Sequence, residues 1–112
     1  MHSLLNPCFG IAGINADSKK ADYVKKVMQR CICNTLEYVS VFVKREPDNI
    51  YDPYAIAVFL NDFQIGYIKK EDNRYFDSLK PEYILPASII NWGLQNGAVY
   101  VVIQTSITCD NS

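Results

Sequence analysis

The sequence predicts a mainly β (α+β) fold, a small and partly open β-barrel of five or six strands with one or two helices. Two observations carry this prediction. Much of the chain alternates apolar, β-branched or aromatic residues with polar ones at the two-residue period of a strand. Turn signals separate these runs, most clearly Asn61-Asp62 and Asn96-Gly97. Because 112 residues suffice for one core and no repeat or linker interrupts them, we expect a single domain over 1–112. Its ordered core should run from about residue 8 to about residue 108.

The N-terminal third predicts a strand followed by a helix. Phe9–Ile14 is short and apolar, and its two glycines indicate a bulge or a close backbone approach. The segment Asp17–Arg30 has helical spacing and a basic excess, which we interpret as a solvated helix face. Residues able to cap its start are Asn15, Asp17 and Ser18. The face predicted to enter the core comprises Tyr23, Val24, Val27, Met28 and Cys31.

The middle of the chain predicts three strands. A turn at Asn34-Thr35 leads into Leu36–Lys44, whose alternate valines share one face. Ala55–Leu60 and Phe63–Ile68 then form a hairpin closed by a two-residue turn. Gly66, inside the returning strand, indicates a kink or a close approach of another strand.

The last third predicts a short helix and two longer strands. Lys70–Leu79 is the helix, and Lys80-Pro81 ends it. Tyr83–Trp92 is extended, and its Pro86 indicates an edge strand or a bulge. Ala98–Ile107 is a long β-branched strand, after which Cys109 to Ser112 should fray. This order of elements fits a small barrel of the OB type.

A polar loop, Glu46 to Tyr54, links two of the predicted strands. Pro47 and Pro53 each fix their own φ and restrict the preceding residue, so the loop should be stiff. Its Asp and Asn residues can bind nearby backbone amides, and its two tyrosines can pack on neighbouring groups. Two interpretations follow: a well-capped turn, or a binding site on the rim of a barrel.

Composition excludes several classes of function. A net charge of −1 and a pI of about 5.7 argue against strong non-specific binding to a polyanion, but allow capture of one strand end. No apolar run is long enough for a membrane helix and no signal peptide is evident, so we expect no membrane association and a cytoplasmic location. The cysteines should then be reduced. They are Cys8, Cys31, Cys33 and Cys109, and their spacing does not suit zinc.

No catalytic constellation is apparent. The only histidine is His2, too near the terminus to anchor a nucleophile triad, and no glycine-rich phosphate loop precedes a helix. We therefore expect a binding module that is not an enzyme and needs no cofactor.

The loop and the strands around it carry a motif in two blocks. The first block reads Arg45-Glu46-Pro47-x-Asn49-x-Tyr51-Asp52-x-x-Ala55-Ile56-x-Val58. The second reads Ile65-Gly66-Tyr67-Ile68-x-Lys70-Glu71. Together they resemble the signature of HIRAN domains, which occur in helicase-like transcription factors, in repair translocases and as stand-alone bacterial or phage proteins. The resemblance implies an OB-like barrel that binds the 3′ end of single-stranded DNA, in repair or replication.

The resemblance also implies roles for six residues. Tyr51 would stack on the terminal base, Asp52 would accept a hydrogen bond from the 3′-hydroxyl, Asn49 would contact the base, and Lys70 would hold the phosphate backbone. Tyr67 stands where the best-known member has a histidine and could still donate through its hydroxyl. Tyr54 stands where Asn is usual and is a substitute platform.

Four of these residues also have a structural interpretation. Tyr51 could plug the barrel mouth, and Asp52 could cap the turn. Asn49 could be a left-handed turn residue, and Lys70 could simply be solvated. The chain departs from the family at Ile14-Asn15-Ala16, where DNA-binding members present aromatic and basic residues. The alternative function is a protein- or ligand-binding barrel without a nucleic-acid role. We favour a monomer in either case.

Overall fold

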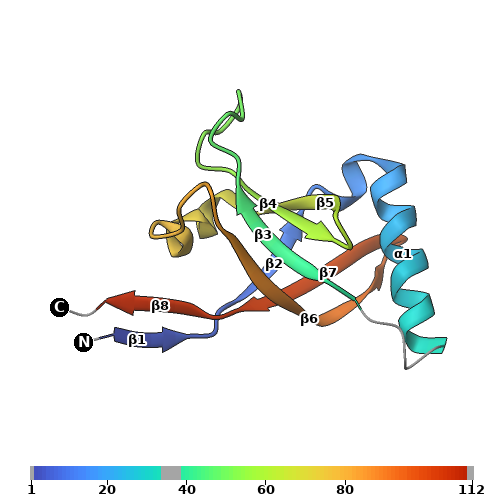
Figure 1. Ribbon diagram of the computed structural model, residues 1–112. Helices are drawn as coiled ribbons and strands as arrows, with labels where there is room; N and C mark the ends of the chain where they lie inside the picture. The colour runs from blue at the N-terminus through green and yellow to red at the C-terminus, as the bar shows by residue number, and fades with distance from the viewer. Residues whose placement is uncertain (1, 34–38, 111–112) are drawn as a thin grey trace.

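The computed structural model describes residues 2–33 and 39–110, and for residues 2–5, 32–33 and 108–110 it describes the backbone alone. Six antiparallel strands form a closed barrel in the order β2-β5-β4-β3-β6-β7 (Figure 1). They are β2 (Cys8–Ala12), β3 (Val41–Arg45), β4 (Ile56–Leu60), β5 (Phe63–Ile68), β6 (Ile84–Gln95) and β7 (Ala98–Thr105). The prediction of a mainly β barrel of five or six strands is confirmed. The barrel is fully closed, where a partly open one was expected.

Strand β2 closes the barrel because it pairs with two different neighbours. Cys8–Gly10 lies opposite β7, and Ile11–Ala12 lies opposite β5. Gly66 of β5 lies against this junction: a Cβ built on it would overlap the carbonyl oxygen of Ala12 and come within 2.8 Å of Cγ2 of Ile11. The close approach that the sequence predicted at Gly66 is therefore confirmed.

A bulge next to Gly66 helps β5 to bend. Val58 of β4 pairs with Gly66, but its neighbour Phe59 pairs with Gln64, so Ile65 is an extra residue on β5. Such bulges increase local twist, which a small closed barrel needs.

The core lies inside the barrel and under one α-helix. Helix α1 (Ser18–Cys33) covers one end of the barrel (Figure 1). The predicted helix face is confirmed: Val24, Val27 and Met28 are buried, while Tyr23 and Cys31 pack against the core from its margin. The predicted inward residues of the last long strand are also buried, namely Val99, Val101, Ile103 and Thr105.

Both predicted two-residue turns are present. Asn61 and Asp62 have φ values of 50° and 68°, and Asn96 and Gly97 have values of 53° and 81°. Positive φ at both central residues matches the right-handed twist of the flanking strands, and asparagine, aspartate and glycine tolerate this conformation best.

Three predicted boundaries are wrong. The first barrel strand ends at Ala12, and Gly13, with φ 85°, turns the chain into the 3-10 helix η1 (Ile14–Ala16), which buries Ile14. Strand β3 begins at Val41, not Leu36; the predicted turn at Asn34-Thr35 and residues 36–38 lie outside the described residues. The short helix after β5 is the 3-10 helix η2 (Lys70–Phe76), which ends before Leu79.

Strand β6 lies inside the barrel order, between β3 and β7, so it is not an edge strand. Pro86 pairs with Phe42 of β3, whereas the pairing with β7 begins only at Ala87. Proline is tolerated here because one side of the strand is still unpaired. The bulge of β6 falls at Ile90 instead, where Ile89 and Asn91 pair with successive residues of β7.

The two ends of the chain form a ribbon that the sequence did not predict. Strand β1 (His2–Leu5) pairs with β8 (Ile107–Asp110), and the ribbon projects from the barrel on the side away from α1 (Figure 1). The backbones of Cys109 and Asp110 are paired with β1, so the predicted fraying from Cys109 is wrong for these two residues; residues 111–112 lie outside the described residues.

We expect Gly66→Ala to lower the free energy of unfolding by about 2–3 kcal/mol, because its Cβ meets backbone atoms of β2 that cannot rotate away. Gly10→Ala is the matched control in the neighbouring strand, since a Cβ there meets only the end of the Lys69 side chain, at 3.5 Å. Urea unfolding of the three proteins measures the effect. Equal midpoints for the wild type and Gly66→Ala would contradict the role assigned to this contact.

Candidate nucleic-acid interface

The loop between β3 and β4, residues 46–54, stands out from the barrel away from α1 (Figure 1). The backbone bond from Glu46 N to Ala55 O, at 3.0 Å, closes its base. Inside the loop, Asn49 Oδ1 accepts hydrogen bonds from the amides of Tyr51, at 2.9 Å, and Asp52, at 3.0 Å. Asp52 Oδ1 accepts one from the amide of Tyr54, at 2.9 Å. The side-chain acceptors thus fold the loop on itself, as the sequence predicted for its Asp and Asn residues.

Glu46 joins this loop to the barrel wall. Its Oε1 accepts hydrogen bonds from Asn49 Nδ2 and from the hydroxyl of Tyr67 on β5, each at 3.0 Å. The sequence analysis gave Glu46 no role. Glu46 belongs to the first block of the motif, but no local sequence pattern predicts that its carboxylate contacts Tyr67, which lies 21 residues later.

Arg45 fixes η2 beside the same loop. Its Nε donates to the carbonyl oxygen of Leu79 at 2.6 Å, and its Nη2 donates to that of Phe76. Phe76 is the last residue of η2, and its carbonyl also accepts from the amide of Leu79 at 2.9 Å. One guanidinium therefore ties the end of η2 to the last residue of β3, directly before the loop.

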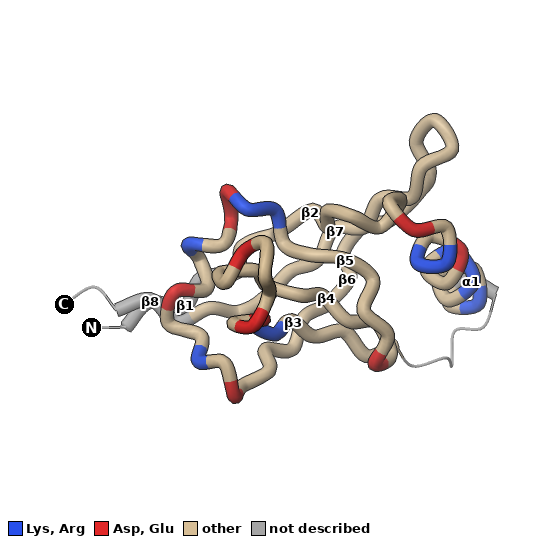
Figure 2. Tube along the Cα trace, turned by 90° about the horizontal axis from the view of Figure 1, so that it is seen from above, with Lys and Arg blue, Asp and Glu red and all other residues tan. Residues whose placement is uncertain are grey.

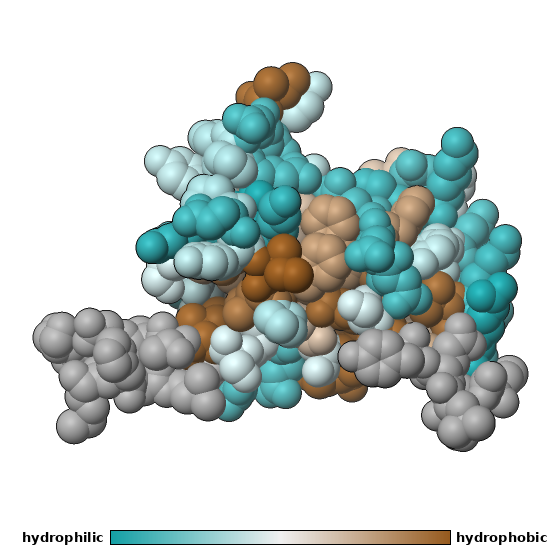
Figure 3. All heavy atoms as spheres, viewed as in Figure 1, coloured by the Kyte–Doolittle hydropathy of each residue, from teal (hydrophilic) through white to brown (hydrophobic). Residues whose placement is uncertain are grey.

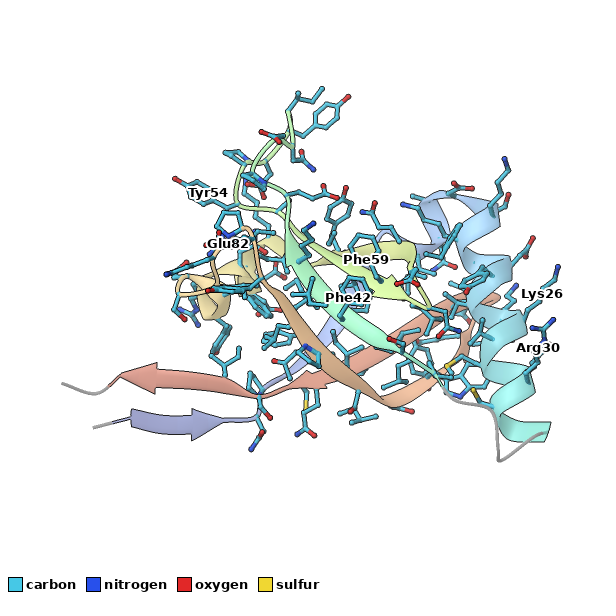
Figure 4. The ribbon with its side chains drawn as sticks, in the orientation of Figure 1. Lys26, Arg30, Phe42, Tyr54, Phe59 and Glu82 are labelled. Atoms are coloured by element: carbon cyan, nitrogen blue, oxygen red, sulfur yellow. The ribbon has the colours of Figure 1, made fainter. Side chains whose placement is uncertain are left out.

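A pocket of about 290 Å³ lies between the loop and β5. It is lined by Asn49, Tyr51, Asp52, Ala55, Tyr67, Ile68 and Lys70. Five of the six residues singled out from the sequence meet here, although 21 positions separate Asn49 from Lys70. The sixth, Tyr54, is not among the lining residues; it is 68% exposed and points outward from the loop (Figure 4).

The pocket presents an open aromatic ring at its mouth. Tyr51 is 91% exposed, so it does not plug the barrel, and its neighbour Ile50 is 87% exposed. The loop that carries them rises above the barrel and is hydrophilic below its hydrophobic tip (Figure 3). A ring held on a stiff loop with both faces accessible is available for stacking on a planar ligand.

The hydrogen-bonding character of the pocket differs from the expectation at Tyr67. Its hydroxyl already donates to Glu46, so towards a ligand the oxygen can act only as an acceptor while that bond lasts. Asp52 also accepts, and Lys70 is the exposed cation of the lining. The pocket thus favours a ligand that brings a donor to its floor and a negative charge to its rim.

Charge around the pocket is mixed. Acidic and basic residues are interspersed along the loop and η2, whereas a separate group of basic residues lies on α1 (Figure 2). Arg74 of η2 contacts the ring of Tyr75, 5.3 Å from its centroid. This distribution agrees with local contacts to a few phosphates better than with a continuous basic track.

The segment Ile14-Asn15-Ala16 supplies no wall for stacking. Ile14 is buried. The side chain of Asn15 makes two hydrogen bonds with the backbone of Val99: its Nδ2 donates to the carbonyl oxygen of Val99 at 2.8 Å, and its Oδ1 accepts from the backbone amide of Val99 at 2.9 Å. In this chain, η1 therefore docks on β7.

A second hollow, of about 510 Å³, borders the same loop. It is lined by Lys44, Arg45, Glu46, Pro47, Asp48, Asn49, Phe59 and Pro81. Phe59 stacks on Phe42 across β3 and β4, with ring centroids 4.8 Å apart, and both rings lie on the outer surface of the barrel (Figure 4). Sequence reasoning did not single out this aromatic pair.

Within the described part of the chain, His, Cys, Asp and Glu side chains form no group of three or more that could hold a metal ion. Cys8 is exposed and Cys31 is half-buried; the side chains of Cys33 and Cys109 lie outside the described residues. No helix among the described residues is both long and apolar enough to cross a membrane.

We expect Asn49→Ala to lower the free energy of unfolding by about 1–2 kcal/mol, because the amides of Tyr51 and Asp52 lose their acceptor. Those two amides should also exchange hydrogen faster, which NMR can measure residue by residue. Asp48→Ala, at an exposed neighbour in the same loop, is the control and should change neither quantity appreciably. Unaltered exchange at Tyr51 and Asp52 in Asn49→Ala would contradict the assigned contacts.

Comparison with known proteins agrees with this geometry. Residues 22–85, more than half of the chain, match the HIRAN domain. The fold is similar to a crystal structure of a protein from Lactobacillus plantarum, with a TM-score of 0.61 and 16% identity over 96% of this chain and 99% of that one. At that identity, the likeness concerns the fold alone. No curated protein matches the sequence. The match over residues 22–85 takes in the loop, the pocket and both blocks of the motif, and the chain therefore belongs to the HIRAN domain family.

Proposed function

We propose that this chain is a DNA-binding module that captures the 3′ end of single-stranded DNA. Membership of the HIRAN family suggests DNA binding. One observation carries the finer proposal: Asn49, Tyr51, Asp52, Tyr67 and Lys70, which come from the loop, from β5 and from the start of η2, line a single pocket.

Each wall of the pocket suits a part of a terminal nucleotide. The ring of Tyr51 offers a stacking surface for the last base, and base–aromatic stacking tolerates every base. Lys70 offers a charge for the phosphate that precedes this nucleotide. Asn49 uses its side chain within the loop, so its contribution is to hold Tyr51 and Asp52 in place, with base contact as a secondary role.

Asp52 would give the site its preference for an end. A carboxylate accepts a hydrogen bond from a free 3′-hydroxyl but repels the phosphate that follows any internal nucleotide. Strand ends of this kind arise in repair and replication. Tyr54, outside the pocket, is a platform for a neighbouring base, and Tyr67 acts as an acceptor.

We further infer that binding, without catalysis, is the activity of this single domain, and that a monomer suffices because all five pocket residues come from one chain. Few phosphates would be contacted, so affinity should be modest and its dependence on salt shallow. Stacking and the hydroxyl contact must then supply the discrimination.

We expect the wild type to bind an oligonucleotide with a free 3′-hydroxyl more tightly than its 3′-phosphorylated twin. Asp52→Ala should remove this preference, whereas Tyr51→Ala should weaken binding of both oligonucleotides by about 1–3 kcal/mol. Fluorescence anisotropy at one fixed salt concentration measures all six affinities. Equal binding of the two oligonucleotides by the wild type, or no binding of either, would refute capture of the 3′ end.

We expect Lys70→Ala to weaken binding and to reduce the slope of log Kd against log salt by about 0.7, the value for one phosphate of a single strand. Lys26→Ala is the matched control, because Lys26 lies on the exposed face of α1 and points away from the barrel (Figure 4). Titrations at four salt concentrations measure the slopes. A reduced slope in Lys26→Ala and an unchanged one in Lys70→Ala would place the phosphate contact on the helix instead.

One observation favours a second candidate function, a protein-binding module. The stacked rings of Phe42 and Phe59 are half-buried on the outside of the barrel, and Ile84, which lies on the neighbouring strand β6, is 56% exposed. Apolar surface of this kind is typical of contact sites. Phe42→Ser combined with Phe59→Ser would abolish such an interaction and leave the anisotropy results above unchanged.

A further inference from the structure

Asp52 has one side-chain partner outside its own loop. Its Oδ1 is held by the amide of Tyr54, but its Oδ2 faces Asn73 of η2, whose Nδ2 lies 3.4 Å away. Asn73 does not line the pocket. Its influence on a nucleotide bound there would therefore pass through the carboxylate of Asp52.

An asparagine at position 73 does not give the fold its greatest stability. It is only 9% exposed, the hydrogen bond from its Nδ2 to Asp52 is long, and its Oδ1 is buried without a hydrogen-bond partner among the described residues. A buried carbonyl without a donor costs stability, whereas an apolar side chain of similar volume would not. Polar groups kept in a core at such a cost are most often found where function requires them.

The backbone that carries Asn73 is fixed with respect to the loop. Arg45 binds the carbonyl of Phe76, the last residue of η2, and that of Leu79 three residues later. The ring of Phe76 packs in the core on Phe9, with centroids 5.1 Å apart. Asp52 is fixed from the other side by the amides and carbonyls of the loop. The backbones that carry Asn73 and Asp52 are thus each held by contacts of their own, and the side-chain amide of Asn73 points at the carboxylate of Asp52.

We propose that Asn73 is a positioning residue that sets the preference of this domain for a free 3′-hydroxyl, an inference that rests on the proposed capture of 3′ ends. Its Nδ2 holds one oxygen of Asp52 from the buried side and so prevents rotation of the carboxylate. The remaining lone pairs stay directed at the pocket, where a hydroxyl can donate to them and a phosphate is repelled. Without this donor, the amide of Tyr54 alone holds the carboxylate, through Oδ1, and Oδ2 is free to turn away from the orientation that suits the hydroxyl.

The test substitutes Asn73 by Leu, which has a similar volume and no donor. The quantity measured is the ratio of two dissociation constants, that of the 3′-phosphorylated oligonucleotide over that of its 3′-hydroxyl twin. We expect the ratio to fall at least threefold towards one, through weaker binding of the hydroxyl form only. The melting temperature should not fall, because the substitution removes a buried unpaired carbonyl. Asn73→Ala serves the same purpose if Leu does not fit.

Two controls isolate the contact with Asp52. Asn91→Leu makes the same chemical change at an exposed position of β6 and should leave the ratio unchanged. The double variant Asp52→Ala, Asn73→Leu should have the same ratio as Asp52→Ala alone, because a residue that acts through Asp52 has nothing left to position.

The outcomes separate the inference from the function on which it rests. A ratio of one for the wild type refutes capture of the 3′ end, and the role of Asn73 with it, before any variant is measured. A wild-type ratio above one that Asn73→Leu and Asn73→Ala both preserve overturns the role of Asn73 alone. An equal loss of affinity for both oligonucleotides also overturns it, because a purely structural role would have that effect.

Discussion

The closure of the barrel depends on a backbone contact that only glycine permits. Gly66 lies so close to Ile11 and Ala12 that any side chain would overlap them, and at this point β2 passes from one neighbour to the other. Tyr67 directly follows Gly66 and Lys70 lies four residues after it, so the same contact determines where one wall of the pocket stands. A loss of this junction would remove the wall as well as the barrel.

The opposite wall is built from hydrogen bonds between groups that are close in sequence. Asn49, Asp52 and Glu46 use their side chains to bind loop amides and the hydroxyl of Tyr67. A ligand therefore meets side chains that are already ordered, and its binding need not offset the entropy of ordering a loop. The same acceptors that build the wall make its interior acidic, since Glu46 and Asp52 both contribute carboxylates.

Features set by neighbouring residues could be predicted from the sequence. The turns at Asn61-Asp62 and Asn96-Gly97, the inward valines of β7 and the core face of α1 follow from local conformational preference and periodicity. The stiff loop followed from its prolines and acceptors. Features set by contacts between distant segments could not be predicted in this way: the pairing of β1 with β8, the full closure through β2, and the use of Arg45 to hold η2.

The candidate site divides in the same manner. The resemblance singled out the residues that line the pocket, but the direction of each hydrogen bond depends on tertiary structure. Tyr67 was expected to donate a hydrogen bond to a ligand, but its hydroxyl already donates to Oε1 of Glu46. Asn73 and Glu46 were overlooked because neither touches the ligand space and neither stands in a periodic pattern; only the folded chain brings them to Asp52 and Tyr67.

The ribbon of β1 and β8 determines how the molecule responds to force. Its strands are antiparallel, with His2 opposite Asp110 at the outer end and Leu5 opposite Ile107 at the barrel (Figure 1). A pull applied at the two ends of the chain loads these pairs one after another, in the unzipping geometry, and never all together in shear. The hydrogen bonds of the ribbon would therefore break in order from His2–Asp110 to Leu5–Ile107, at a lower force than the barrel needs to unfold.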